Sequence, residues 1–195
     1  MSNILILNLH QQYEGFADGN LNKAIAAEAR RFFEANGHTV RETVINDGYD
    51  VEEELEKFGW ADVFFVQSPV YWMGLPWLGK KYIDEIFSAG RGTVTFSNDG
   101  RTTGGTYGSG GLMHGKPYML SFTYNCPASE FGNPDGFFEG LDIDGANVAL
   151  HKTFRFCGAS PLESFSVHDV YDPGFDLAPN LARLETVLAR NFPVA

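Results

Sequence analysis

A short apolar run that leads directly into an aromatic loop and a helix start restricts the possible folds of this chain more than any other feature. The run Val63 to Val66 contains no alternating polar residue, as expected of a strand that is buried on both faces. The next residues include Tyr71, Trp72 and Gly74, and Pro76 stands where the first residue of a helix would lie. This order predicts one strand-helix unit of a parallel sheet covered on both sides.

The loop after this strand is a candidate wall of a binding pocket. In an open α/β sheet, ligands bind beyond the carboxyl ends of the strands, where the segment from Ser68 to Pro76 must lie. Its aromatic side chains suit a flat, aromatic ligand. The alternative is that they only cover the edge of the sheet, as large apolar side chains often do.

Composition excludes several classes of protein. The 195 residues are 44% hydrophobic and 20% charged, which is ordinary for a globular chain and predicts a single domain over residues 1–195. The net charge of −11 and the absence of a Lys/Arg run argue against nucleic acid as a partner. No stretch is long enough to span a bilayer, and no signal peptide opens the chain, so we expect no stable membrane insertion and a cytoplasmic location.

Hydrophobic periodicity predicts alternating strands and helices. Strands are expected at Ile4–Leu7, Thr39–Ile45, Val63–Val66, Tyr118–Tyr124 and Phe165–Val170. Helices are expected at Leu21–Gly37, Asp50–Phe58, Pro76–Phe87, Val148–Phe156 and Leu177–Phe192, with a helical turn at Asp135–Glu139. The Gly-rich segment Ser97–Gly111 is predicted to be a long loop, either functional or mobile.

This alternation predicts a doubly wound, three-layer α/β fold of the flavodoxin type, with a five-stranded parallel sheet in the order 2-1-3-4-5. In that order the ends of the first, third and fourth strands meet at the topological switch point. The loops Asn8–Leu21, Ser68–Pro76 and Thr123–Pro127 should therefore converge. The first loop enters a helix whose free amides can hold a phosphate, although Asp18 or Asn20 could instead serve only as the N-cap.

Motifs of other enzyme classes are missing from the sequence. No Gly-x-Gly-x-x-Gly pattern follows the first strand and no Walker A pattern occurs, which disfavours a Rossmann NAD-binding domain or an NTPase. The five histidines have no zinc spacing, no Gly-x-Ser-x-Gly elbow is present, and Cys126 and Cys157 are expected to pack as small hydrophobes. A site of aromatic rings and backbone amides is typical of proteins in which a cofactor carries the chemistry.

Six segments of the chain match the motifs of one known family. They are Trp60-Ala61-Asp62, Tyr71 to Trp77, Lys80 to Asp84, Asp99-Gly100-Arg101, Tyr107 to Gly111 and Lys116 to Ser121. These segments resemble bacterial modulator of drug activity B proteins, which are NAD(P)H:quinone oxidoreductases of the DT-diaphorase-like flavodoxin-fold group. The similarity extends over nearly the whole chain, although the first loop departs from the family pattern at Leu9-His10, where relatives tend to have small residues.

The resemblance implies FAD as cofactor, NADPH or NADH as electron donor, a quinone as substrate and a homodimer. It places the flavin phosphates on the first loop and the isoalloxazine on the second and third loops. The cofactor-binding residues implied are Ala17, Asp18, Gly19, Asn20, Leu21, Asn22, Lys23, Pro69, Val70, Tyr71, Trp72, Tyr107, Thr123, Tyr124, Asn125 and Cys126.

The expected mechanism is ping-pong: NAD(P)H reduces the flavin and leaves, and a quinone then takes two electrons in its place. Tyr107 and His151 are the candidate proton donors, but a tyrosine hydroxyl is a weak acid at neutral pH without help, and His151 has helix packing as the alternative role. An azo or nitro reductase with the same flavin site is the first competing hypothesis. The second is a non-catalytic, flavin-binding regulatory subunit of a potassium-efflux system.

Overall fold

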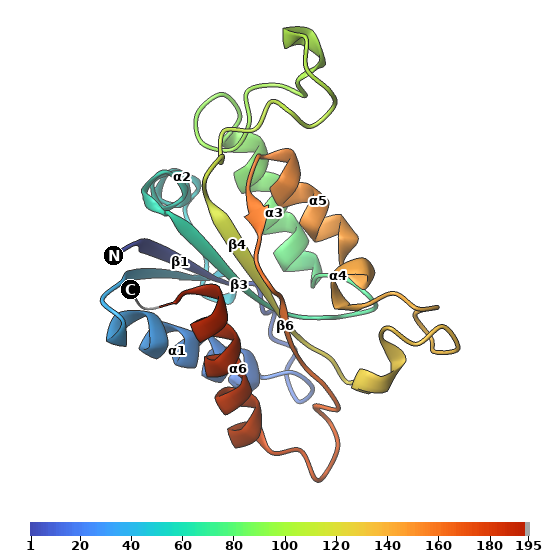
Figure 1. Ribbon diagram of the computed structural model, residues 1–195. Helices are drawn as coiled ribbons and strands as arrows, with labels where there is room; N and C mark the ends of the chain where they lie inside the picture. The colour runs from blue at the N-terminus through green and yellow to red at the C-terminus, as the bar shows by residue number, and fades with distance from the viewer. Residues whose placement is uncertain (194–195) are drawn as a thin grey trace.

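A parallel sheet runs through the centre of the molecule. The computed structural model describes residues 1–193 and is shown in Figure 1. Its strands are β1 (Asn3–Asn8), β2 (Thr39–Val44), β3 (Val63–Pro69), β4 (Pro117–Thr123), β5 (Ser160–Pro161) and β6 (Phe165–Val167). All neighbouring strands pair in parallel, in the order β2-β1-β3-β4-β5, and β6 also pairs with β4. The flavodoxin-type fold and the order of the first four strands agree with the prediction.

The fifth position of the sheet differs from the prediction because two short strands share it. Pro161 pairs with Tyr118, and Phe165 pairs with Ser121, so the outer chain carries one residue more than β4 between these pairs. Such an extra residue is a β-bulge, and Pro161 cannot donate to a ladder. The strand expected at Phe165–Val170 ends at Val167.

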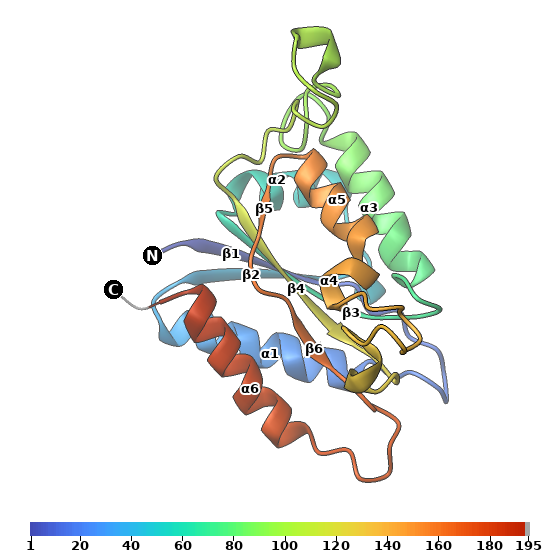
Figure 2. The same cartoon turned by 45° about the vertical axis from the view of Figure 1, so that its right-hand side comes forward.

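Helices cover both faces of the sheet. They are α1 (Asn20–Ala35), α2 (Val51–Trp60), α3 (Trp77–Ala89), α4 (Ile143–Ala146), α5 (Val148–Phe156) and α6 (Leu177–Asn191), with 3-10 turns at Ile45–Asp47, Arg101–Thr103 and Ala128–Glu130. Figures 1 and 2 show α1 and α6 together on one face, and α2, α3 and α5 on the other. Within residues 1–193, no helix is long and apolar enough to cross a membrane.

Alternate residues of the central strands feed two separate cores. Leu5 and Leu7 of β1 pack with Phe58 of α2 and the inner side of α3, whereas Ile4 and Ile6 pack with α1 and α6. When both faces of a strand pack against apolar residues, a polar residue at every second position would be buried without a partner. The continuous apolar runs of β1 and β3 follow from this packing.

The expected helical turn at Asp135–Glu139 is wrong. This segment forms a series of turns, and the nearby helix α4 begins later, at Ile143. Gly140 has a φ of 86°, and its N–H donates to the carbonyl of Asn133, which closes a compact loop instead of a helix. The Gly-rich segment from Ser97 to Gly111 is irregular apart from one 3-10 turn, and it extends from the amino-end side of β4 (Figure 1).

Candidate functional site

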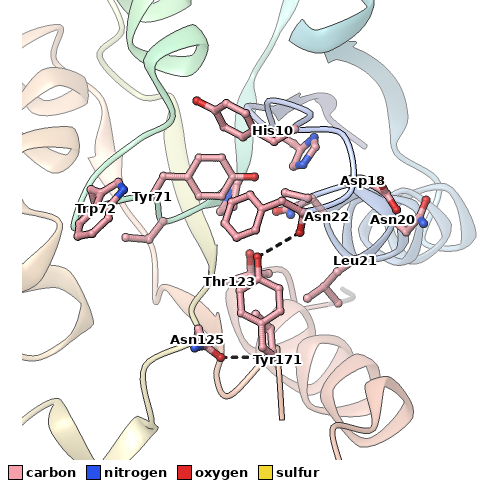
Figure 3. Close-up of a pocket in the computed structure, with 17 residues that line it drawn as sticks. His10, Asp18, Asn20, Leu21, Asn22, Tyr71, Trp72, Thr123, Asn125 and Tyr171 are labelled. Carbon is pink, nitrogen blue, oxygen red and sulfur yellow. Dashed lines mark hydrogen bonds between the residues drawn. The ribbon is translucent and has the colours of Figure 1, made fainter. Parts of the chain in front are cut away.

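A cavity of about 890 Å³ lies where the carboxyl ends of β1, β3 and β4 face the start of α1, and Figure 3 shows the residues around it. We call it the main cavity. It lies at the predicted switch point, and the three predicted loops converge on it. Its lining residues are His10, Tyr13, Phe16, Ala17, Asp18, Gly19, Asn20, Leu21, Asn22, Pro69, Val70, Tyr71, Trp72, Thr123, Asn125, Val170 and Tyr171.

The start of α1 leaves backbone donors free at one end of the main cavity. Gly19, rather than Asp18 or Asn20, is the N-cap, and it provides no side chain to bond the first amides of the helix. Free amides and the positive end of the helix dipole favour an anion at such a position. The sequence hypothesis that Asp18 or Asn20 serves only as a cap is therefore wrong.

His10 packs directly beneath this helix start. Gly19 has a φ of 81°, and a Cβ atom there would lie 2.6 Å from the His10 ring. His10 is only 3% exposed, and within residues 1–193 its Nε2 atom has no hydrogen-bond partner. Burial and the nearby charge of Lys23 lower the pKa of His10. The loop thus holds an unsatisfied polar atom next to free helix amides.

The loop after β3 forms a tight turn that exposes a tryptophan. Tyr71 and Gly74 exchange two backbone hydrogen bonds, of 2.9 and 3.2 Å, and the residues between them, Trp72 and Met73, have φ angles of 49° and 64°. Trp72 is 97% exposed. Tyr71 donates its hydroxyl to the carbonyl of Gln11 at 3.1 Å, and burial raises its pKa to about 12, so it stays a neutral donor.

The loop after β6 also lines the main cavity, although sequence reasoning did not include it. Tyr171 donates its backbone N–H to Asn125 Oδ1 at 3.2 Å, and its ring lies 6.0 Å from the ring of Phe16. This fourth loop approaches because β6 pairs with the end of β4. The feature of the sequence that could have indicated this loop is the aromatic Tyr171, which directly follows the predicted last strand. His10, Tyr13, Phe16 and Val170 were missed as well.

Four implied cofactor residues do not line the main cavity: Lys23, Tyr107, Tyr124 and Cys126. Lys23 lies one turn into α1. Tyr124 is buried, accepts a hydrogen bond from Asn147 Nδ2 at 2.6 Å and stacks on His168, and burial raises its pKa to about 12. The backbone carbonyl of Cys126 accepts a hydrogen bond of 3.0 Å from His168 Nδ1. The second cysteine, Cys157, is buried as expected.

The structure does not bring Tyr107 or His151 to the main cavity either. Tyr107 lies on the Gly-rich loop, where its ring packs 5.4 Å from that of Phe156. His151 is buried in α5, with Nδ1 2.7 Å from the Tyr118 hydroxyl and Nε2 3.1 Å from Asp144. Burial raises the pKa of Tyr118, so its hydroxyl stays protonated. Its hydrogen bond with Nδ1 joins α5 to the sheet.

Comparison with known proteins gives consistent results. Residues 2–188 match the family described as having a flavodoxin-like fold. The chain is 43% identical over 173 residues to NADPH:quinone oxidoreductase MdaB of Haemophilus influenzae, covering 86% of this chain and 88% of that protein. It is 42% identical over 179 residues to an uncharacterized protein of Schizosaccharomyces pombe, with 90% of each chain covered.

Solved structures share the fold at lower sequence identity. A Klebsiella pneumoniae protein, provisionally assigned as a quinone reductase, superposes with a TM-score of 0.75 at 20% identity, over 97% of this chain and 83% of its own. General stress protein 14 of Treponema denticola, solved in complex with FMN, gives a TM-score of 0.64 at 19% identity, with 100% of both chains covered. At these identities the likeness establishes the fold alone.

Proposed function

Because this chain belongs to the flavodoxin-like fold family, and within it to the group of NADPH:quinone oxidoreductase MdaB, we propose that it is a flavin-dependent oxidoreductase. Its reaction is the two-electron reduction of a quinone by NADPH or NADH. The observation that carries this proposal is the main cavity, which joins an anion-binding helix start to an aromatic wall.

The phosphate end of the main cavity fits a flavin nucleotide. Gly19 leaves the first amides of α1 free, and a side chain at this position would fill the space beside His10. His10 Nε2 is buried without a partner in residues 1–193, and a phosphate oxygen would supply the missing acceptor or charge. An apolar ligand would leave these donors unsatisfied.

The other end of the main cavity fits the flat ring of a flavin. The segments Pro69–Trp72 and Thr123–Asn125 lie next to each other because β3 and β4 are paired up to Pro69 and Thr123. When bound, a flavin supplies the two-electron chemistry that links a nicotinamide to a quinone. The chain's own residues orient the ring, through the Tyr71 and Trp72 side chains and the backbone of the tight turn.

The proposed reaction is ping-pong: NADPH or NADH and then the quinone use the same open side of this site in turn. We propose FAD as the flavin, on the strength of the resemblance to the quinone reductase group. FMN is the alternative, because a structural neighbour binds it. Aromatic side chains from Phe16 and Tyr171 at the mouth of the main cavity are in position to contact the part of the ligand beyond the phosphates.

A second copy of the chain completes this proposal. Trp77, Leu141 and Val148 are exposed apolar residues around α3, α4 and α5, and a groove of about 230 Å³ separates these helices. Helices α3 and α5 both run from the main-cavity end of the molecule towards the Gly-rich loop (Figure 1). A two-fold axis across this face would bring the partner's Tyr107 towards the main cavity. Within its own subunit, Tyr107 is exposed at the end of the molecule that lies far from this cavity.

The test is to purify the protein and identify the flavin that denaturation releases by chromatography. The protein is then mixed anaerobically with NADPH or NADH, and loss of the flavin absorbance near 450 nm is followed. We expect FAD, bleaching by at least one nucleotide, and recovery of colour on adding a quinone. Plots of reciprocal rate against reciprocal quinone concentration should be parallel at several NAD(P)H concentrations. A protein that binds flavin but is not bleached by either nucleotide is not this enzyme, and a regulatory role would then replace it.

A further inference from the structure

A row of buried polar side chains lies under the start of α1, next to the apolar residues of the central strands. Asn8 of β1, Gln67 of β3 and Ser121 of β4 are in register on neighbouring strands, and each is fully buried. The residues below them on this face, such as Ile6 and Phe65, belong to the apolar core against α1. Burying polar groups in such a place is unfavourable unless their hydrogen bonds are made.

Two members of this row form a relay to α1. Ser121 Oγ donates to Gln67 Oε1 at 2.6 Å, and Gln67 Nε2 donates to Asn22 Oδ1 at 2.7 Å. Asn22 is the third residue of α1, is 5% exposed, and lines the main cavity. The relay therefore crosses from β4 through β3 to the helix start.

In this arrangement the side-chain oxygen of Asn22 faces Gln67. An Asn side chain has one acceptor oxygen and one NH2 group with two donors. Because Gln67 occupies the oxygen of Asn22, the NH2 group remains for a partner in the main cavity. Turned the other way, Asn22 would present an oxygen to a phosphate and repel it.

We propose that Gln67 and Ser121 are positioning residues that set the Asn22 amide as a hydrogen-bond donor to the phosphate of a flavin nucleotide. This inference rests on the proposed flavin site and adds to it a cause of selectivity. Flavin nucleotides carry the phosphate, whereas riboflavin has the same ring system without it. The relay should strengthen binding of FAD and FMN and leave binding of riboflavin unchanged.

The experiment measures the dissociation constants of FAD, FMN and riboflavin by titrating flavin fluorescence with flavin-free protein. The variants are Gln67→Met, which keeps the side-chain length and removes the donor, Asn22→Ala, and the double variant. We expect Gln67→Met to weaken nucleotide binding about tenfold, equal to about 1.4 kcal/mol, and riboflavin binding by less than about twofold. Because Gln67 acts through Asn22, the double variant should bind nucleotides no more weakly than Asn22→Ala.

Thr43→Val is the matched control. Thr43 is a buried residue of the edge strand β2, and its hydroxyl donates to Glu54 of α2 at 2.8 Å. Because neither residue lines the main cavity, this variant reports the effect of general destabilisation. Unfolding by urea shows whether each variant is folded. Equal losses for nucleotides and riboflavin in Gln67→Met, or additive losses in the double variant, would overturn the relay. A wild-type protein that binds none of the three flavins would instead refute the proposed function.

Discussion

At the scale of single residues, the turn from Tyr71 to Gly74 stores strain beside the main cavity. Both central residues, Trp72 and Met73, have positive φ angles, a type I′ geometry that favours Asn and Gly. A left-handed conformation costs an L-residue about 1–2 kcal/mol. We infer that the exposed Trp72 at this strained position serves contact with a ligand and not stability.

We predict that Trp72→Gly makes the flavin-free protein more stable and the flavin complex weaker. Relief of strain, less the added entropy of glycine in the unfolded chain, should raise the free energy of unfolding by about 0.5–1 kcal/mol. Loss of the aromatic contact should weaken flavin binding several-fold, since such contacts contribute about 0.5–1.5 kcal/mol. Urea denaturation and fluorescence titration measure the two effects.

Met73→Gly provides the comparison for this prediction. Met73 shares the strained turn but does not line the main cavity. Its replacement should stabilise the chain in the same way with a smaller effect on flavin affinity. If Trp72→Gly binds flavin as well as the wild type does, Trp72 is not a flavin contact.

At the scale of elements, α2 is held at both ends by side chains. Asp50 accepts hydrogen bonds from the backbone N–H groups of Glu52 and Glu53 at its start. At its end, Lys116 Nζ donates to the carbonyls of Phe58, Gly59 and Ala61, at 2.9, 3.2 and 2.6 Å. Lys116 directly precedes β4, so one side chain ties a helix end to a central strand. Its positive charge also suits the negative end of the helix dipole.

Lys116→Met is therefore expected to lower the free energy of unfolding by about 1.5–3 kcal/mol, the range for hydrogen bonds to a charged group. Lys80→Met is the control, because Lys80 forms an exposed pair with Asp84, and such pairs contribute less than about 1 kcal/mol. Urea denaturation midpoints of both variants provide the measurement. Similar losses in the two variants would show that the Lys116 contacts do not hold α2.

At the scale of the whole molecule, three histidines make stability depend on pH. Burial lowers the pKa of His10, His38 and His168 relative to exposed histidine. Between the folded and unfolded pKa values the unfolded chain binds more protons, so the free energy of unfolding decreases as pH falls through and below about 6.5. The contribution of these histidines to the free energy of unfolding should be fully present above this pH range.

Urea denaturation of flavin-free protein at several values between pH 5 and 8 tests this dependence. The triple variant His10→Gln, His38→Gln and His168→Gln should lose much of the slope near pH 6. The carboxyl of Asp144 has a lowered pKa, chiefly because of its hydrogen bond with His151, and it adds a further loss only at more acidic pH. Stability that rises on acidification from pH 7 to 5.5 would contradict the sign.

Assembly belongs to the same scale. If a second copy covers α3 and α5, a charge at Val148 should separate the dimer, because a carboxylate would be buried in an apolar contact. We expect Val148→Glu to sediment as a monomer at micromolar concentration and to lose flavin affinity. Ala189→Glu, an equal charge on the exposed side of α6, should not change the assembly. A wild-type protein that is monomeric at these concentrations would refute the proposed dimer.

The sequence by itself determined the elements and their order, because local patterns report local structure. The doubly buried runs of β1 and β3, the periodic helices and the loop from Ser68 to Pro76 were all readable, and the switch-point rule then brought three loops together. The bulge between β5 and β6 was not readable, because an extra residue has meaning only opposite a partner strand.

Only the tertiary structure decided which side chains face the cavity and which are used inside the protein. Tyr171 reaches the cavity from the loop after β6, whereas both ring nitrogens of His151 are hydrogen-bonded inside the protein, to Tyr118 and Asp144. The relay from Ser121 through Gln67 to Asn22 joins residues 45 and 54 positions apart. Such contacts depend on the packing of distant elements, and no periodicity along the chain encodes them.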